Sequence, residues 1–348
     1  MVKMERLTIK EIARLAGVSK ATVSRVLNGR PGVSPQTREK VEKIIQTYSY
    51  RPSPLARGLS SQKTGVIALV ISHSAARLSA HPFLLEFLPG ISHVLEEHGF
   101  RLVLSIPDSE ERYELACQLI AQEKLAEGVV VLGVRRNDPR LPFLAKNNIP
   151  LVTVGRPIGY TGISFVDADN YGGARLATEH LIELGYKQIL FVNGPKEHTA
   201  AIAREEGYKA AMLAHNLKPE VAYGDFSYMS GYRAVKEWWR KGRRVLAVFA
   251  ASDMAAIGAS TAFKEMGIKV GKKAAVVGFD DIPYASLFDP PLTTVRQPIR
   301  ELGEAAGRLI LRVLEGGVTE SVILPTALVV RGSTSGLASK NLDLSLLP

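Results

Sequence analysis

Short apolar runs alternate with helical patterns from residue 65 onward, and this alternation limits the fold more than any other feature. Residues 65–72 form a nearly continuous apolar run, as expected of a strand that is buried on both faces. The alternation predicts parallel sheets with helices on both faces. Further strands are expected at residues 102–106, 128–132, 151–154, 188–192, 245–249 and 274–279, with helices at 83–98, 171–184, 201–215, 230–240 and 252–266.

The predicted strands are too numerous for one small sheet, and their order suggests two similar halves. A dinucleotide-binding protein would carry a Gly-x-Gly-x-x-Gly turn after a strand, and neither half has one. The sequence lacks a Gly-x-Ser-x-Gly nucleophile turn and a P-loop, and its seven histidines and single Cys117 show no metal-ligand spacing. We therefore expect a binding protein without enzymatic activity, cofactor or metal, in which Asp280 and Asp281 are a loop feature rather than an acid pair.

The first part of the chain predicts two short helices joined by a tight turn, within residues 8–28. Thr8 and Glu11 have the spacing of a capping box, which starts the first helix. Gly17 suits the turn, and Ser19 can cap the second helix. A helix-turn-helix of this kind can read the DNA major groove, whereas a helical hairpin without a DNA role is the alternative. The exposed start of the second helix presents Lys20, Ala21, Thr22, Ser24 and Arg25.

Positive charge is concentrated in this part of the chain. The net charge is +10, and residues 1–63 contain 13 Lys and Arg but only 4 Asp and Glu. The other 285 residues contain 31 Lys and Arg and 30 Asp and Glu, so they are nearly neutral. A localised basic excess on a helix-turn-helix favours binding to the phosphate backbone of DNA.

The sequence predicts neither export nor membrane insertion. Residues 1–10 alternate charged and apolar side chains, unlike the apolar core of a signal peptide. The chain has no run of about eighteen apolar residues. A single cysteine cannot form an internal disulfide, which fits a reducing compartment. The expected location is the cytoplasm, with no membrane partner.

A third helix and a linker follow the helix-turn-helix. Ser34 and Pro35 predict the start of the helix. Residues 50–64 contain two prolines and a polar tail, which are typical of a linker. Ser53 and Pro54 also suit the start of a helix, so residues 54–61 could form two helical turns. Two turns are too short to be stable alone in water, so this segment is a candidate switch. The expected buried stripe of the third helix is Val41, Ile44, Ile45 and Tyr48.

Four segments carry a resemblance to a known family. They are residues 18–28 (Val-Ser-Lys-Ala-Thr-Val-Ser-Arg-Val-Leu-Asn), 50–59 (Tyr-Arg-Pro-x-x-x-Ala-Arg-x-Leu), 277–281 (Val-Gly-Phe-Asp-Asp) and 291–298 (Pro-Leu-Thr-Thr-Val-Arg-Gln-Pro). On these motifs the chain resembles the lactose-repressor family of bacterial transcription regulators, from about residue 8 to about residue 336. The resemblance implies a multidomain fold. A small all-α helix-turn-helix head and a hinge helix precede two doubly wound α/β subdomains of the periplasmic-binding-protein type.

The resemblance also implies where the domains begin and end. The DNA-binding domain is expected at residues 6–52, the hinge helix and linker at 53–64, and the effector-binding and dimerisation domain at 65–338. Within the last domain, subdomain N covers about residues 65–167 and 296–325, and subdomain C covers about 168–295 and 326–338. The three crossovers between the subdomains are expected near Asp167, Val295 and Pro325.

The second helix of the head is implied to be the recognition helix. Arg25 suits guanine, because its fork of donors matches O6 and N7. At the position of Ala21 some members of the family have a polar residue, whereas alanine offers a base only a methyl contact. Many of the other positions usually bind phosphate, although capping or packing explains each of them equally well. The implied DNA-contacting set is Thr8, Ser19, Lys20, Ala21, Thr22, Ser24, Arg25, Asn28, Ser34, Thr37, Tyr50, Ser53, Ala56, Arg57 and Leu59.

Leu59 matches the residue that family members insert into the minor groove, one from each subunit, at a central base step. Unstacking that step costs about a few kcal/mol and yields a kinked, wider groove that the paired hinge helices fill. Packing of Leu59 on its own domain is the alternative.

For the cleft between the subdomains, the resemblance implies a carbohydrate ligand. Arg204 and Asp280 match a ligand-binding arginine and an acidic ligand residue, and together such groups suit sugar hydroxyls. Phe226 matches an aromatic residue that stacks on the ligand ring, with a core position as the alternative. Ser252 stands where several members have asparagine and is otherwise an N-cap. The implied set is Phe83, Arg156, His198, Arg204, Phe226, Ser252 and Asp280, and Ala200 stands where some members place a polar contact.

Together these features predict a repressor of sugar-utilisation genes that binds a pseudo-palindromic operator as a homodimer. A small molecule in the cleft is expected to bias the ordering of the hinge helices, with a coupling of about 1–3 kcal/mol. A dimer is favoured over a tetramer because residues 337–348 are too few for a substantial coiled coil. The alternatives are a global regulator with a phosphorylated carrier protein as corepressor and, from another class, a sugar-binding transport component.

Overall fold

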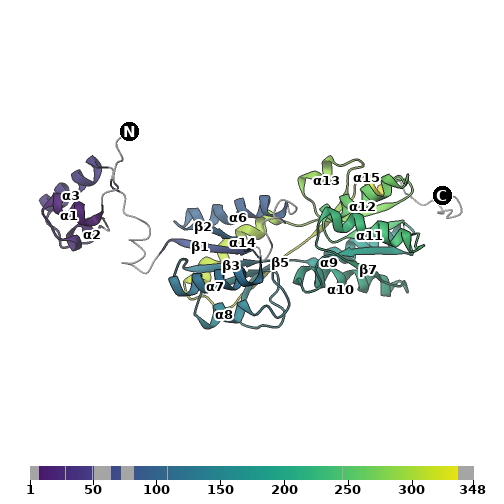
Figure 1. Ribbon diagram of the computed structural model, residues 1–348, viewed down its shortest axis with the longest axis horizontal. Helices are drawn as coiled ribbons and strands as arrows, with labels where there is room; N and C mark the ends of the chain where they lie inside the picture. Colours follow the sequence, from purple (N-terminus) through teal and green to yellow (C-terminus); the bar gives the residue numbers. More distant parts are fainter. Residues whose placement is uncertain are drawn as a thin grey trace. The chain divides into compact units, whose positions relative to one another are not determined.

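The computed structural model describes residues 8–27, 29–48, 50, 64–71, 82–107, 109–244 and 246–335. The chain divides into two compact units, and the boundary along the sequence lies between Gly65 and Val66 (Figure 1). The first unit is helical and the second is an α/β body. Several predicted positions lie outside the described residues, and with them the expected hinge helix: Asn28, Ser53, Ala56, Arg57 and Leu59.

The first unit begins with the predicted helix-turn-helix. Its described helices are α1 (Ile9–Ala16), α2 (Lys20–Leu27) and α3 (Pro35–Thr47). The capping box of α1 is confirmed: the Thr8 amide donates to Glu11 Oε2 at 2.6 Å, and the Glu11 amide donates to Thr8 Oγ1 at 3.4 Å. Gly17 ends α1 with a φ of 66°, a left-handed conformation that favours glycine.

A small apolar core holds these three helices together. Ile12, Val23 and Val41, one residue from each helix, are fully buried in it. Burial of one such aliphatic side chain contributes about 1.5–3 kcal/mol. The prediction that Tyr48 is buried is wrong, because this residue follows the last turn of α3 and is 52% exposed.

The second unit is built on two six-stranded sheets (Figure 1). The strands of the first sheet are β1 (Val66–Ile71), β2 (Arg101–Ser105), β3 (Gly128–Leu132), β4 (Leu151–Val154), β5 (Ser164–Ala168) and β11 (Ser321–Leu324). Those of the second are β6 (Ile189–Asn193), β7 (Glu220–Tyr223), β8 (Ala247–Ala250), β9 (Ala275–Asp280), β10 (Thr293–Arg296) and β12 (Ala327–Val329). The strand orders are β11-β5-β4-β3-β1-β2 and β12-β10-β9-β8-β6-β7. All pairings are parallel except that of β12 with β10.

Helices pack on each sheet and complete two lobes. The N-lobe consists of the first sheet with α6 (Phe83–Glu97), α7 (Glu110–Glu123), α8 (Arg140–Lys146) and α14 (Ile299–Leu314). The C-lobe consists of the second sheet with α9 (Asn170–Glu183), α10 (Thr199–Ala214), α11 (Tyr228–Arg240), α12 (Asp253–Glu265), α13 (Pro283–Leu287) and α15 (Gly332–Ser335). The predicted combination of a helical head and two doubly wound α/β parts is confirmed.

The strands and helices expected between residues 65 and 279 are present, with ends shifted by at most two residues. The prediction missed β5, β7, β10, β11 and β12, which are short, and among the helices α8, α13, α14 and α15. The prediction also made no distinction between β2 and the buried strands. Three of the five residues of β2 are exposed, because β2 lies at the edge of its sheet.

The chain passes between the two lobes three times. It leaves the first sheet after β5 to enter α9, leaves the second after β10 to enter α14, and returns from β11 to β12. These passages lie close to the expected crossovers, while the exact subdomain boundaries remain a prediction. Any ligand between the lobes therefore lies next to the connections that join them.

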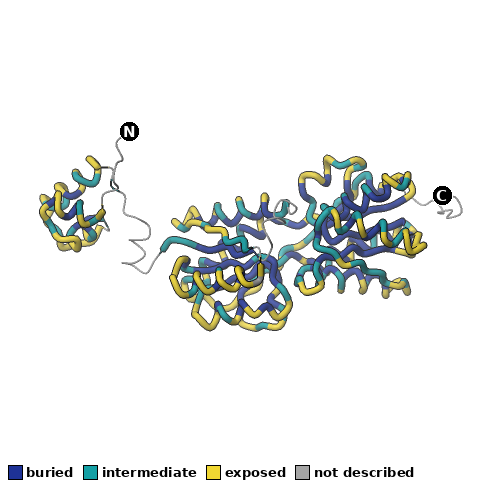
Figure 2. The backbone as a smooth tube through the Cα atoms, in the orientation of Figure 1, coloured by how far each residue is buried: buried dark blue, intermediate teal, exposed yellow. Residues whose placement is uncertain are grey.

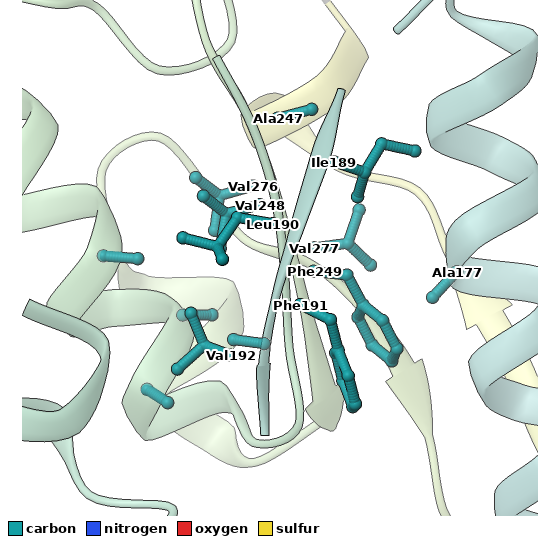
Figure 3. Packing of buried hydrophobic residues seen from close by; sticks show 14 of the residues in the cluster. Ala177, Ile189, Leu190, Phe191, Val192, Ala247, Val248, Phe249, Val276 and Val277 are labelled. Carbon is teal, nitrogen blue, oxygen red and sulfur yellow. The ribbon is translucent and has the colours of Figure 1, made fainter. Parts of the chain in front are cut away.

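The strands of the C-lobe sheet carry its core on both faces. Figure 3 shows the rings of Phe191 and Phe249 side by side on neighbouring strands, with centroids 4.7 Å apart. Val276 and Val277, on β9, are fully buried. The buried tube along these strands and the exposed loops at their ends are visible in Figure 2. The core of the C-lobe therefore runs along almost the whole length of β6, β8 and β9.

Helices α6 and α14 approach each other closely in the N-lobe. A Cβ atom on Gly90 would lie 2.2 Å from the Arg300 carbonyl oxygen, and one on Gly303 would lie 2.3 Å from the Phe87 carbonyl oxygen. Neither position can accept a side chain unless the backbone shifts. The missed helix α14 is therefore an integral part of the lobe, since it also packs on β3, β4 and β5.

Candidate functional site

The recognition surface predicted for the head lies on α2. Lys20, Ala21 and Arg25 are exposed, and Thr22 and Ser24 are half-buried. Val23 and Val26, on the opposite side of the helix, are buried in the head core. One face of α2 is therefore available to bases, as the helix-turn-helix prediction requires.

The hydroxyl groups expected to bind phosphate cap helices in this structure. Ser19 Oγ accepts from the Thr22 amide at 3.1 Å, and Ser34 Oγ accepts from the Thr37 amide at 3.3 Å. Thr8 takes part in the capping box of α1, and Tyr50 is half-buried and packs against the head core. Capping accounts for Thr8, Ser19 and Ser34 whether or not they also bind phosphate.

A cleft opens between the N-lobe and the C-lobe. Its empty volume, the solvent-facing mouth included, is about 860 Å³. Six of the seven predicted ligand residues line it, and Ala200 lines it too; Arg156 is exposed and does not. The lining residues are Ile71, Phe83, Leu84, Leu132, Gly133, Val154, Gly155, Asp167, Ala168, Asn170, His198, Ala200, Arg204, Phe226, Ser252, Asp280, Gln297 and Leu302.

Arg204 is the buried cation of the cleft. It projects from α10, and its Nε donates to Asn170 Oδ1 at 2.8 Å, while Nη1 donates to the Ala251 carbonyl oxygen. The guanidinium carbon lies 3.8 Å from the centroid of the Phe279 ring. Nη2 lies 3.9 Å from Asp280 Oδ1, too far for a hydrogen bond. The guanidinium plane is therefore fixed on two sides, and Nη2 remains available to a ligand oxygen.

Asp280 is the acidic partner of Arg204, at the end of β9. Its Oδ1 accepts from Gln297 Nε2 at 2.6 Å, a contact made next to the passage from β10 to α14. Burial raises the pKa of Asp280 to about 6, although Arg204 and the Gln297 hydrogen bond act in the opposite direction. Its φ is 121°, a backbone conformation that side chains rarely adopt. Strain of this kind is concentrated at functional sites.

Asp167 is a third charged group that the sequence analysis placed only near a crossover. Its Oδ2 accepts from the Arg156 amide at 3.1 Å, and its Oδ1 accepts from Asn170 Nδ2 at 2.8 Å. Burial raises the pKa of Asp167 to about 6. Through Asn170 this carboxyl group, at the end of β5, is connected to Arg204.

Sequence reasoning missed Asp167, Asn170 and Gln297 as cleft residues. All three lie where the chain passes between lobes, so a polar residue at an expected crossover was the available signal. The strand that ends near Asp167 was not predicted, and Gln297 lies within the family-like segment 291–298 without having been singled out.

Phe226 forms an aromatic wall of the cleft. Its φ is 65°, an outlier for a bulky residue, and it lies edge-on to the His198 ring with centroids 5.3 Å apart. Ser252 Oγ donates to the Phe226 carbonyl oxygen at 2.7 Å and accepts from the Ala255 amide at 3.1 Å. Ser252 therefore acts as the N-cap of α12 and also fixes the backbone of Phe226.

Backbone hydrogen bonds connect the lobes at one side of the cleft. The Thr199 amide donates to the Val134 carbonyl oxygen at 3.0 Å, and the Arg136 amide donates to the Glu197 carbonyl oxygen at 2.8 Å. Arg135 and His198 form an isolated antiparallel bridge between these two contacts. This interlobe bridge links the N-lobe and the C-lobe at one side of the cleft.

Comparison with known proteins decides the family. Residues 8–53 match the model of bacterial regulatory proteins of the lacI family, and residues 178–334 match the periplasmic binding protein-like domain. The HTH-type transcriptional regulator CelR of Thermobifida fusca is 38% identical over 96% of this chain and 100% of its own length. The chain belongs to the lacI family of bacterial regulatory proteins. It is therefore a DNA-binding transcription regulator.

Solved structures of lacI-family proteins share this architecture. The CelR–cellobiose complex matches with a TM-score of 0.75 and 37% identity, over 94% of this chain and all of that chain. The lac repressor dimer bound to operator and an anti-inducer matches with a TM-score of 0.84 and 29% identity, over 95% of this chain and 99% of that chain. The lacI-family resemblance given by the sequence motifs is thus confirmed, and the relatives are regulators.

Within the described residues no group of three or more His, Cys, Asp and Glu side chains could hold a metal ion. No helix in the described part is long and apolar enough to cross a membrane.

Proposed function

We propose that this regulator is a repressor whose affinity for its operator is set by a sugar bound in the cleft. The observation that carries the proposal is the convergence of Arg204, Asp280 and Asp167 on one cavity. A sugar presents many hydroxyl groups, each able to donate to a carboxylate and accept from a guanidinium. Phe83 and Phe226 supply the apolar walls that a sugar ring needs.

The named relatives support a sugar rather than another small molecule. A structure of CelR, which shares 37% identity with this chain, is described as a complex with cellobiose. The six cleft residues proposed to touch the sugar are Phe83, His198, Arg204, Phe226, Ser252 and Asp280, and we add Asp167, Asn170 and Gln297.

Control of DNA binding follows from the position of the cleft between lobes. A bound sugar contacts both lobes and so favours one angle between them. The segment 53–64 joins the head to β1 of the N-lobe, so the lobe angle biases whether this segment forms a hinge helix. In a cytoplasmic homodimer two heads then read the half-sites of a pseudo-palindromic operator, with Leu59 wedged at the centre.

Calorimetric titration of the full chain with cellobiose, ribose and other mono- and disaccharides tests the sugar site. At least one sugar should bind, and Asp280→Asn should weaken the binding of that sugar. Asp289→Asn, which changes an exposed loop residue, should leave its binding unaltered. A duplex selected from a random pool then serves as the operator. Unchanged operator binding at saturating sugar would contradict the proposal, as would a response only to a phosphorylated carrier protein.

A further inference from the structure

We infer that the C-lobe carries a second surface for duplex DNA, at the end of its sheet opposite the cleft. Ser252 and Asp280, which line the cleft, lie at the carboxyl ends of β8 and β9. Because β6, β7, β8 and β9 are parallel, their amino-terminal ends lie together at the end of the sheet opposite the cleft. We call this surface the basic edge, defined by Lys187, Lys218, Arg240, Lys241, Arg243, Arg244, Lys264, Lys269, Lys272 and Lys273.

The sheet topology brings these residues together from four separate connections. Leu190 pairs with Glu220, and Ala247 pairs with both Ile189 and Ala275, so the four strands begin at nearly the same level. Neighbouring strands are about 4.8 Å apart, and four of them span about 15 Å. Basic residues precede each strand, and all ten residues of the basic edge are exposed.

The charge at this edge is strongly unbalanced. Against ten Lys and Arg, the same connections and the helix and strand ends that flank them hold four acidic residues, Glu183, Glu220, Glu237 and Glu265. The turn before β10 adds a fifth, Asp289. The rest of the chain after residue 63 then contains 21 Lys and Arg and 25 Asp and Glu, given totals of 31 and 30. The near-neutrality of the second unit therefore conceals a separation of charge, with one basic end.

Internal contacts do not account for this excess. In the described chain, Arg243 is the member of the basic edge that forms an ion pair, with Glu220 at 3.4 Å. Glu265 pairs instead with Lys236, at 2.9 Å. Helix dipoles explain Arg240 and Lys264, which lie in the last turns of α11 and α12, but the dipole effect falls off within that turn. The remaining residues lie in connections.

Two observations favour duplex DNA as the partner. Seven of the ten residues are lysines, which bind phosphate but are depleted from protein–protein interfaces. Single-stranded nucleic acid would need free aromatic faces for its bases. The two tryptophans at this edge are half-buried, and each already has a cation over its ring: the Arg243 guanidinium lies 5.1 Å from the Trp238 ring, and that of Arg244 lies 4.5 Å from the Trp239 ring. A duplex requires only phosphate contacts.

Lysine footprinting on the full chain tests the surface directly. Acetylation rates of individual lysines are measured by mass spectrometry with and without a random-sequence duplex, at low and at physiological ionic strength. Lys187, Lys218, Lys269, Lys272 and Lys273 should react more slowly with the duplex present, as should Lys20 in the head. Lys124 and Lys146, exposed in the N-lobe, should be unaffected. Protection of Lys20 without protection of the basic-edge lysines would overturn the inference. Parallel reactions use an acidic polypeptide and single-stranded RNA in place of the duplex. Protection of the basic-edge lysines by either of these but not by the duplex would also overturn it.

A matched pair of triple variants provides the second test. Arg240→Gln, Lys272→Gln and Lys273→Gln together should weaken binding of the random duplex about 3- to 10-fold and make its salt dependence shallower. Arg101→Gln, Lys124→Gln and Lys146→Gln remove the same charge from exposed N-lobe positions and should change neither. Equal weakening of duplex binding by the two triple variants would show a general attraction of charge, and it would overturn the inference of a localised surface. Sugar binding should be unchanged in both, so failure here is separate from failure of the proposed function.

Discussion

Arg204 illustrates how a single buried side chain organises the cleft. Three contacts, to Asn170, Ala251 and the Phe279 ring, fix the guanidinium plane before any ligand binds. A planar fork held in this way loses little freedom when it binds hydroxyl oxygens. Lysine would retain the charge but could not make the same set of contacts.

We therefore predict that Arg204→Lys weakens sugar binding about 10- to 100-fold, because hydrogen bonds to charged groups contribute about 1.5–3 kcal/mol. Calorimetry with the sugar identified by screening measures the loss. Arg175→Lys, which changes an exposed arginine paired with Glu179 at 2.7 Å, is the control and should bind as the wild type does. Similar losses in both variants would remove Arg204 from the sugar site.

The raised pKa of Asp280 leads to a pH prediction. Because this carboxyl group has a pKa of about 6 in the folded chain and an ordinary value of 3.8, the folded chain holds its proton more tightly than the unfolded chain does. The wild type should therefore gain stability relative to Asp280→Asn as the pH falls from 7 to 4. Thermal unfolding of both proteins across this range measures the difference. A difference that does not vary with pH would contradict the assignment.

In the head, Arg25 is the residue of α2 best suited to read a base. Arg25→Ala should cost about 1–3 kcal/mol of operator binding and relax the preference at one base position. Arg14→Ala, which removes an exposed arginine from α1, should leave base preference intact. Selection of duplexes from a random pool by each variant makes the comparison, and an unchanged preference for Arg25→Ala would exclude direct readout.

At the scale of elements, the sequence predicted what apolar periodicity and caps control. The capping box of Thr8 and the buried strand β3 (Gly128–Leu132) were located to the residue. Strand β10 (Thr293–Arg296) was missed, because its threonines gain their partners only in the folded lobe. The Thr293 amide donates to Ser333 Oγ of α15 at 2.8 Å, and Thr294 Oγ1 donates to Asp253 of α12. Asn170 was missed for a similar reason: its amide group connects Asp167 to Arg204 only after the chain has crossed between lobes.

Close packing of α6 against α14 gives an element-scale prediction. Gly303→Ala gains about 0.5–1 kcal/mol of helix propensity, but its Cβ would lie 2.3 Å from the Phe87 carbonyl oxygen. Overpacking of this kind costs about 1–3 kcal/mol, so the variant should be less stable in chemical denaturation. Arg308→Ala on the same helix removes only an exposed pair with Glu304 and should have a small effect. A stabilised Gly303→Ala would show that the two helices can separate without loss.

For the whole molecule, the proposed function makes the cleft between the lobes the point of control. Three chain passages and the interlobe bridge of residues 134–136 with 197–199 lie around one cavity. The two lobes can adopt different angles, and a ligand that favours one angle shifts the equilibrium between them. The size of the shift is set by the ligand's difference in affinity for the two lobe angles. In the proposed function, operator and sugar are therefore linked through the same equilibrium of lobe angles, although they bind to different units.

Reciprocal linkage between sugar and operator tests this account most directly. The dissociation constant of the selected operator duplex is measured with and without saturating sugar, and that of the sugar with and without saturating duplex. Both should change by one and the same factor, about 5- to 150-fold, since thermodynamic linkage requires it. A sugar that binds the cleft with equal affinity in the presence and absence of the operator would contradict control through the cleft.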